Sequence, residues 1–230
     1  MSSLILNSIL NVALLTGLFA VADKGIAAVG LQRPYYAVHV LHNAAMVALT
    51  AGDVWDSFTR LYELPTLPVT WPAIWLCFAL HFYHLLLYWR SFRFDDWLHH
   101  GLMIGVALPL GCVVGSAGPL VGFSLFFTTG LPGGVSYAAL WLERNGCLRR
   151  ATEKRVNRIM NVWIRAPGCV AHGALTAAVI LSLSAEATVD WQLVGGLLTA
   201  ALTSWNGLYF MEQAVASHAA ETARGAALTA

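Results

Sequence analysis

The residues best suited to chemistry in this 230-residue chain lie between Arg90 and His100, where a short polar stretch separates two long apolar segments. Asp95 precedes His99 by four residues, and Asp96 precedes His100 by the same spacing. Residues four apart share one face of a helix, so each carboxylate would lie one turn before a histidine. A carboxylate there can orient an imidazole and raise its basicity, as a general base requires. The same aspartates also suit a helix N-terminus, where acidic side chains cap backbone amides.

Further histidines lie inside apolar segments, and most of them are paired at a spacing of three residues. They are His39 with His42, His81 with His84, and the single His172. Ionisable groups inside a membrane cost roughly 2.5–3.5 kcal/mol on insertion scales and usually face the interior of a helix bundle or a wet cavity. The pairs therefore predict either hydrogen bonds between helices or one shared polar cavity, which Tyr83 and Arg90 would also line.

Neutral imidazole is also a ligand for iron, copper and zinc, so a histidine-ligated, metal-dependent membrane oxidase is one alternative. The histidines here lack the longer spacings and the later His-x-x-His-His-like boxes of membrane di-iron enzymes. We therefore expect no metal and no other cofactor.

Two segments nearer the C-terminus add polar groups that the interior of a bundle would accommodate. Pro132 lies among three glycines and must kink or unwind its helix, and Thr128 lies one turn before it. Carbonyl groups freed at that depth are tolerated only where protein or a water-lined cavity satisfies them. Asn206 and Tyr209 share a face of the last apolar segment. We expect these four residues to line the same cavity, and a simple packing kink explains Pro132 equally well.

The composition indicates a membrane protein. Hydrophobic residues make up 58% of the chain and charged residues 11%, whereas soluble domains carry about 25% charged residues. Runs of about 20 apolar residues can cross ~30 Å of hydrocarbon. We therefore expect an all-α, polytopic transmembrane helix bundle of about seven spans, at 3–23, 36–53, 69–90, 97–116, 119–142, 159–184 and 190–214.

The basic residues are distributed asymmetrically over the loops that these spans define. Twelve of the thirteen lie on one side of the expected membrane, and the other side holds only Arg60. By the positive-inside rule, the C-terminus is expected to be cytosolic and the N-terminus lumenal or external. The net charge of +1 gives no indication of a nucleic-acid partner.

Three of these segments together resemble a known membrane family. They are Asp95 to His100 at the start of a span, His81-Phe-Tyr-His84 leading to Arg90, and Trp205 to Phe210 in the last span. In combination they resemble the TLC domain (TRAM, Lag1 and CLN8). The resemblance covers about residues 34–216 of a single membrane domain, 1–230, with 1–33 as an extra N-terminal span and loop and 217–230 as a flexible tail.

This resemblance implies contact with sphingolipids or other acyl lipids, in the endoplasmic reticulum or another endomembrane. Ceramide synthases of the family transfer an acyl chain from acyl-CoA to a sphingoid amine, and their pattern has a histidine pair, a threonine three residues later and two aspartates in the next span. His99 and His100 match the pair, Met103 stands at the threonine position, and the later aspartates have no counterpart. The resemblance therefore favours lipid binding, sensing or trafficking.

Three alternatives to this lipid-handling function stay open. The first is an acyl-CoA-dependent acyltransferase that uses His99 or His100 as general base. The second is a non-enzymatic subunit of a larger membrane complex, and the third is the metal-dependent oxidase. The expected partners are membrane lipids, together with a second copy of the chain or a membrane complex.

Overall fold

The computed structural model describes residues 2–107, 109–110, 118–183 and 191–227, and this part of the chain is helical with no strand. The α-helices are α1 (Ser2–Ala28), α2 (Pro34–Thr59), α3 (Trp71–Tyr88), α4 (Phe94–Leu102), α6 (Pro119–Leu125), α7 (Leu131–Arg144), α8 (Arg150–Met160), α9 (Ala166–Leu183) and α10 (Trp191–Ala227). Short 3₁₀ turns at Leu61–Thr66 and Trp89–Ser91 follow α2 and α3. The predicted all-α class is confirmed.

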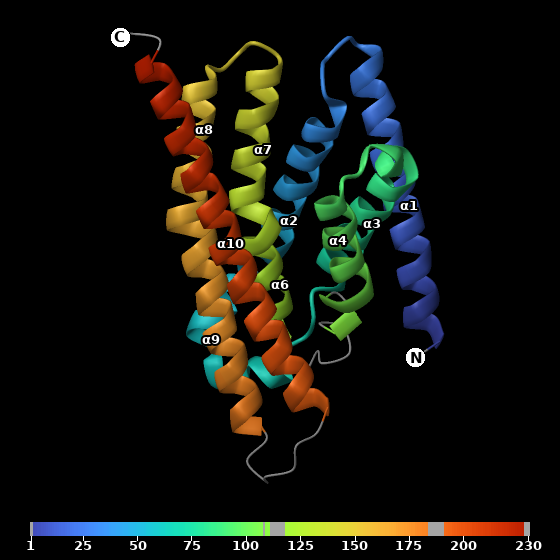
Figure 1. Ribbon diagram of the computed structural model, residues 1–230. Coiled ribbons are helices and arrows are strands. Elements are labelled where there is room, and N and C mark those ends of the chain that lie inside the picture. Colours follow the sequence, from blue (N-terminus) through green and yellow to red (C-terminus); the bar gives the residue numbers. More distant parts are fainter. Residues whose placement is uncertain (1, 108, 111–117, 184–190, 228–230) are drawn as a thin grey trace.

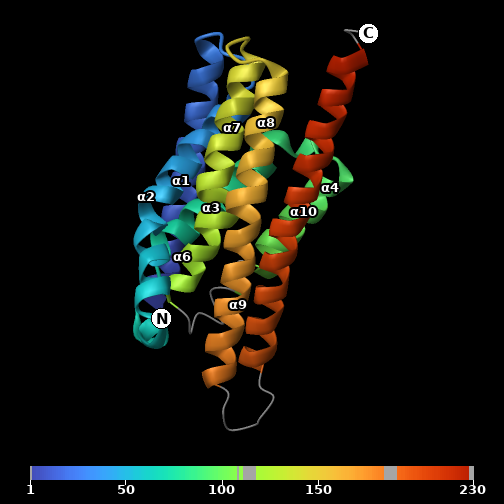
Figure 2. The same ribbon diagram turned by 90° about the vertical axis from the view of Figure 1, so that its left-hand side faces the viewer.

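The helices form an elongated bundle (Figure 1). At one edge α1 packs against α3 and α2, and at the other edge α9 and α10 form the most extensive helix pair. The central helix α2 also contacts α6 and α7. Figure 1 and Figure 2 together show the short helix α4 on the same face of the bundle as α10. This arrangement brings α2, α3 and α4 toward the middle of the molecule, where the candidate site lies.

Three helical segments of the described chain are long and apolar enough to cross a membrane: Ser3–Ala28, Trp71–Ser91 and the continuous run Arg150–Ser182. In α1 the exposed side chains include Leu14 and Val21, at 62% and 70%. Hydrocarbon would cover such a surface without the cost that it has in water. The predicted membrane location is therefore plausible for these helices. The expected span at 97–116 lies partly outside the described residues, as do the ends of the expected spans at 184 and 190.

Wider π-helical turns interrupt the helices of the described chain at Met103–Ala107, Phe126–Gly130 and Asn161–Arg165. The second turn ends two residues before Pro132. There the Leu131 N–H donates to the Phe126 carbonyl, five residues earlier, so the chain accommodates the proline without ending the helix. The disruption expected at Pro132 is thus a local widening between α6 and α7. The last two π-helical turns also contact each other.

The C-terminal helix α10 is longer than the expected span at 190–214. It continues through Ala227, so the expected tail from residue 217 onward is helical as far as the structure describes it. Glu221 of this extension accepts a hydrogen bond from Arg150 Nε at 3.0 Å. The contact joins the end of α10 to the start of α8.

Glycines allow α9 and α10 to approach closely. A Cβ added at Gly207 would lie 2.5 Å from the Cβ of Cys169 and 3.2 Å from the Cα of Ala166. Both neighbours belong to the rigid part of α9, so no side-chain rotation would relieve the overlap. Gly207 therefore sets the spacing of this helix pair.

Gly207→Ala is expected to lower the melting temperature of the purified protein, because overpacking costs about 1–3 kcal/mol, or roughly 2–12 °C in a chain of this size. Gly52→Ala in α2 is the matched control, since a Cβ there meets no atom within 4 Å. Thermal unfolding in a neutral detergent, followed by circular dichroism, measures both variants. Equal melting temperatures for the two would contradict the close approach.

Candidate functional site

Five of the histidines singled out in the sequence lie in one group of rings between α2, α3 and α4. His39 and His84 are stacked, with ring centroids 4.7 Å apart. The His81 ring lies 5.5 Å from His99 and 5.1 Å from His100, and the rings of His84 and His100 are also 5.1 Å apart. We call these five residues the histidine cluster. His42 and His172 lie outside it.

Backbone carbonyl groups orient two members of the cluster. His81 Nδ1 lies 2.8 Å from the carbonyl oxygen of Cys77, and His39 Nδ1 lies 2.8 Å from that of Tyr35. Each Nδ1–H donates to the carbonyl one turn earlier on its own helix. In a neutral ring this leaves Nε2 as a hydrogen-bond acceptor. Helix geometry therefore fixes the tautomer of both rings and leaves two acceptor nitrogens in the cluster.

Aromatic side chains enclose the cluster on two sides. Tyr137 of α7 is stacked on His39 at a centroid distance of 4.0 Å, and Tyr35 of α2 lies 4.3 Å from the same ring. Phe92, in the turn before α4, is stacked on His100 at 4.6 Å. The sequence analysis did not single out Tyr35, Tyr137 or Phe92. A tyrosine four residues before His39 was the available signal for Tyr35.

His84 and His100 are buried without complete hydrogen bonding. His84 is 4% exposed, and neither of its ring nitrogens has a hydrogen-bond partner among the described residues. His100 is 5% exposed, and its Nδ1 also has no hydrogen-bond partner among them. A buried polar group without a partner costs about 1–3 kcal/mol. His99, in contrast, is exposed. The cluster therefore presents unsatisfied polar groups inside the bundle and one accessible ring at its edge.

The two aspartates of the polar stretch lie at the start of α4. Asp96 Oδ2 accepts the backbone N–H of Arg93 at 2.9 Å, as a helix cap does. Within the described residues no hydrogen bond joins Asp95 or Asp96 to a histidine. Arg90 is exposed, with its guanidinium over the Trp89 ring at 5.2 Å. The contacts of the aspartates are thus those of a helix start, and the carboxylate–imidazole pair of a general base is not among them.

A second polar group lies where α2 meets the π-helical turn at Phe126–Gly130. His42 Nδ1 lies 2.7 Å from Asn43 Oδ1, and Thr129 Oγ1 donates to the same oxygen at 3.0 Å. Thr128 instead bonds to the carbonyl oxygen of Ser124, in its own helix. Neither His42 nor Thr128 has a member of the histidine cluster as a partner in these bonds.

The predicted residues of the later helices also lie apart from the cluster. Tyr209 is stacked on Trp205 at 5.3 Å, and both side chains are exposed. Asn206 Oδ1 is buried without a hydrogen-bond partner among the described residues. Pro132 is buried at the start of α7. None of the ring contacts of Tyr209 includes a histidine in the described chain.

Asp23 of α1 is a buried carboxylate that the sequence analysis missed. It is 3% exposed, and the hydroxyls of Tyr83 and Tyr88 both donate to its Oδ2 at 2.5 Å. Tyr83 also lies beside the cluster, with its ring 5.2 Å from that of His84. The first helix is therefore joined to the helix that carries His81 and His84. A single carboxylate near the end of an apolar helix was the available signal.

Arg165 is a second buried charge that acquires importance only in the structure. It ends the π-helical turn Asn161–Arg165, is 8% exposed, and donates from Nη1 to Asn161 Oδ1 at 2.7 Å. Its guanidinium lies over the Phe210 ring at 4.8 Å. In the sequence analysis it counted only as one of the basic residues that indicate topology.

The histidine cluster does not have the geometry of a metal centre. In the described residues no group of three or more histidine, cysteine, aspartate or glutamate side chains is arranged to hold a metal ion. The rings meet by stacking and edge-to-face contact, as in an aromatic cluster. This geometry gives the oxidase alternative no support.

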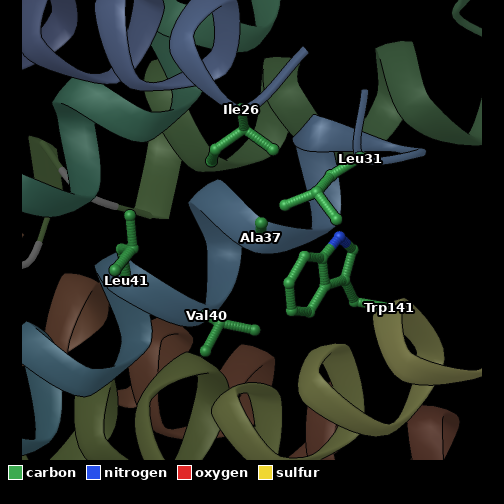
Figure 3. A pocket seen from close by; sticks show the side chains of 6 residues that line it. All are labelled: Ile26, Leu31, Ala37, Val40, Leu41 and Trp141. Carbon is green, nitrogen blue, oxygen red and sulfur yellow. The ribbon is translucent and has the colours of Figure 1, made fainter. Parts of the chain in front are cut away.

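Two apolar pockets border α2 away from the cluster. The first, of ≈ 290 Å³, is lined by Ile26, Leu31, Ala37, Val40, Leu41 and Trp141, which come from α1, the following turn, α2 and α7 (Figure 3). The second, of ≈ 320 Å³, lies between α2 and the region around α7 and is lined by Val40, Asn43, Ala44, Val47, Gly130, Leu131, Gly134 and Val135. No histidine lines either pocket.

Comparison with known proteins adds no relative. No family model, no curated protein and no solved structure matches this chain. The functional inference therefore rests on the residues and geometry of the chain itself, and membership of the TLC family stays a prediction.

Proposed function

We propose that this protein is a multi-span integral membrane protein that binds an amphipathic lipid, whose polar headgroup lies at the histidine cluster. The observation that carries the proposal is His84, buried at 4% exposure with neither ring nitrogen bonded among the described residues. Burying such a ring without a partner is unfavourable, and polar groups inside membrane helices usually serve a function. A headgroup with donors and acceptors would satisfy the ring.

The surroundings of the cluster support a lipid as the ligand. Apolar side chains cover the exposed faces of α1 and α3, among them Leu14, Val21 and Leu86. A molecule that reaches the cluster from such surroundings must itself be compatible with hydrocarbon. The aromatic rings around the histidines suit a ligand that is polar at one end and apolar along the rest.

The proposal includes about seven spans with the basic loops on the cytosolic side. Contacts between loops support this topology. Trp141 Nε1 donates to the Gln32 carbonyl at 3.1 Å, and the Gln32 N–H donates to Asn145 Oδ1 at 3.0 Å. These bonds join the basic segment after α1 to the basic segment after α7, so both lie at one end of the bundle, as the positive-inside rule requires.

Within the proposed TLC-like function, lipid binding, sensing or trafficking is favoured over acyl transfer. A general base needs a partner that orients its imidazole, and the carboxylate of Asp96 is engaged by the backbone of Arg93. Sphingolipids or other acyl lipids are the proposed ligands, and the endoplasmic reticulum or another endomembrane is the proposed location.

His100→Ala is expected to reduce lipid binding about tenfold or more, because it removes a ring that contacts His81, His84 and Phe92 and carries an unsatisfied nitrogen. The measurement is photo-crosslinking of a photoactivatable fatty acid to the purified protein in neutral detergent, with co-purified lipids identified by mass spectrometry.

His218→Ala is the matched control, because His218 lies in the extension of α10 and makes no ring contact with the cluster. It is expected to crosslink like the parent protein. Equal labelling of all three proteins would contradict a site at the cluster. A stoichiometric protein partner in place of lipid would instead favour the membrane-complex alternative.

A further inference from the structure

We infer that the bound lipid has an anionic headgroup, a carboxylate or a phosphate, and that Arg165 and Asn43 hold it. The inference deepens the proposed lipid-binding function and rests on it. It starts from the guanidinium of Arg165, which is buried in the longest of the three helical segments able to cross a membrane, Arg150–Ser182.

Arg165 has no counter-ion among the residues that the structure describes. The ion pairs that the described residues form do not include it. Its Nε has no hydrogen-bond partner among them, and the neutral oxygen of Asn161 receives the bond from Nη1. A buried charge without a partner is strongly unfavourable. An anion would supply the missing partner.

The depth of Arg165 separates it from the arginines that mark topology. It is seven residues beyond Arg158, which is roughly 10 Å along a helix. Of the basic residues of α8, Arg150 and Arg155 are exposed, and Lys154 and Arg158 are half-buried. A topology signal needs no arginine at this depth, so Arg165 requires another explanation.

Asn43 of α2 supplies a second donor beside Arg165. Its Oδ1 accepts bonds from His42 and Thr129, which orients the amide and leaves the Nδ2 hydrogens without an acceptor among the described residues. Asn43 is fully buried. An orphaned amide donor is costly and, like Arg165, calls for an acceptor.

Gly133 of α7 brings the two donors to the same place. Asn43 Nδ2 lies 2.9 Å and Arg165 Nη2 lies 3.7 Å from the point where a Cβ of Gly133 would stand. A larger residue at Gly133 would force Asn43 Nδ2 to move. A planar guanidinium with an adjacent amide donor matches the two or three oxygens of a carboxylate or phosphate.

This donor pair belongs to the same region as the histidine cluster. Tyr137 lies one turn after Gly133 on α7 and is stacked on His39. The charge of Arg165 also acts electrostatically on Tyr137 and on His99, the exposed ring at the edge of the cluster. A headgroup held by Arg165 would therefore lie beside the histidines.

The test measures the affinity of the full-length protein in neutral maltoside detergent for four probes. Palmitate is the carboxylate lipid, lysophosphatidate the phosphate lipid, monopalmitin the neutral lipid, and inorganic phosphate the soluble anion. Arg165→Gln is expected to weaken the binding of palmitate or lysophosphatidate about tenfold or more. Arg165→Lys is expected to weaken it less, because lysine keeps the positive charge but lacks the planar, bidentate donors of the guanidinium. Monopalmitin binding is expected to stay unchanged.

Arg155→Gln is the matched control, since it removes an exposed charge from the preceding turns of the same continuous helix. It is expected to bind all four probes like the parent protein. The melting temperature of ligand-free Arg165→Gln is expected to equal or exceed that of Arg155→Gln, because the substitution removes an uncompensated buried charge. A clearly lower value would make Arg165 a structural residue and overturn the inference.

The remaining outcomes separate this inference from the proposed function. If Arg165→Gln loses affinity for palmitate and for monopalmitin equally, the assignment of an anionic headgroup is overturned, while the proposed lipid binding stands. If no lipid probe binds the parent protein, the proposed function fails. If inorganic phosphate alone binds, and does so through Arg165, the anion site stands with a soluble ligand in place of a lipid.

Discussion

Replacing His84 by phenylalanine is expected to raise the melting temperature of the ligand-free protein while it reduces lipid binding about tenfold or more. The ring of His84 packs against His39 at 4.7 Å and Tyr35 at 4.8 Å, and phenylalanine can keep these contacts. What the substitution removes is a pair of buried nitrogens without partners. Removing them is worth about 1–3 kcal/mol, or roughly 2–12 °C.

The opposite signs of the two effects make this prediction specific. A histidine retained for packing or for bonds between helices would lose stability on replacement. A histidine retained for a ligand lowers the stability of the ligand-free protein, because its ring is satisfied only when the ligand binds. Functional sites commonly have this cost in stability. Thermal unfolding with and without the photoactivatable fatty acid measures both the stability and the lipid binding of the same sample.

His172→Phe is the matched control. His172 is 2% exposed, and its Nδ1 has no hydrogen-bond partner among the described residues. Unlike His84, it uses its other nitrogen: Nε2 lies 3.2 Å from Thr176 Oγ1, so the substitution breaks a hydrogen bond. It is expected to lower the melting temperature and to leave lipid binding unchanged. A fall in melting temperature for His84→Phe as large as that for His172→Phe would show that His84 has a structural role only.

Asp23→Leu is expected to destabilise the protein by about 2–4 kcal/mol, which lowers the melting temperature by roughly 5–15 °C. The carboxyl group accepts the hydroxyls of both Tyr83 and Tyr88, and its loss leaves the two hydroxyls without that acceptor. It also weakens the attachment of α1 to α3, the helix that presents His81 and His84. Lipid binding is therefore expected to fall together with stability.

A combined variant tests whether the three groups act as one unit. In Tyr83→Phe with Tyr88→Phe, the carboxyl group of Asp23 is left buried without its donors. Adding Asp23→Leu to that background is expected to restore part of the lost stability, because the variant then buries no polar group there. If the three substitutions lower the melting temperature additively, the hydrogen bonds do not couple α1 to α3.

His84→Phe and Asp23→Leu probe two different kinds of buried polar group in the same region. His84 is a polar group that the bundle leaves unsatisfied, and Asp23 is one that it satisfies fully. Both lie in apolar helices, where hydrogen bonds and close packing hold helices together in place of the hydrophobic effect. The bonds of Asp23 stabilise the frame, and the unbonded ring of His84 is available to a ligand.

The amino-acid sequence by itself determined the class of the protein and part of the site. Helical periodicity and 58% hydrophobic content predict an all-α membrane protein, because a chain in lipid must satisfy its own backbone. The spacing of three residues in His81 and His84 fixes their common face through local helix geometry alone. Local rules of this kind need no knowledge of which helices become neighbours.

Tertiary structure decided which of these side chains meet. His39 reaches His84, and His81 reaches His99 and His100, only because α2, α3 and α4 converge. The same spacing of three residues led the sequence analysis to group His42 with His39, and the structure places His42 on Asn43 instead. Short-range spacing gives the direction of a side chain and does not give its partner on another helix.

For the buried charges too, the sequence does not show which partner on another helix each side chain has. In the sequence, Asp23 is a single carboxylate and Arg165 one of thirteen basic residues. Their difference arises from long-range contacts: two tyrosines of α3 satisfy Asp23, and no carboxylate of the described chain reaches Arg165. The energy of a buried charge depends on its partners, and only the packing of the helices determines those partners.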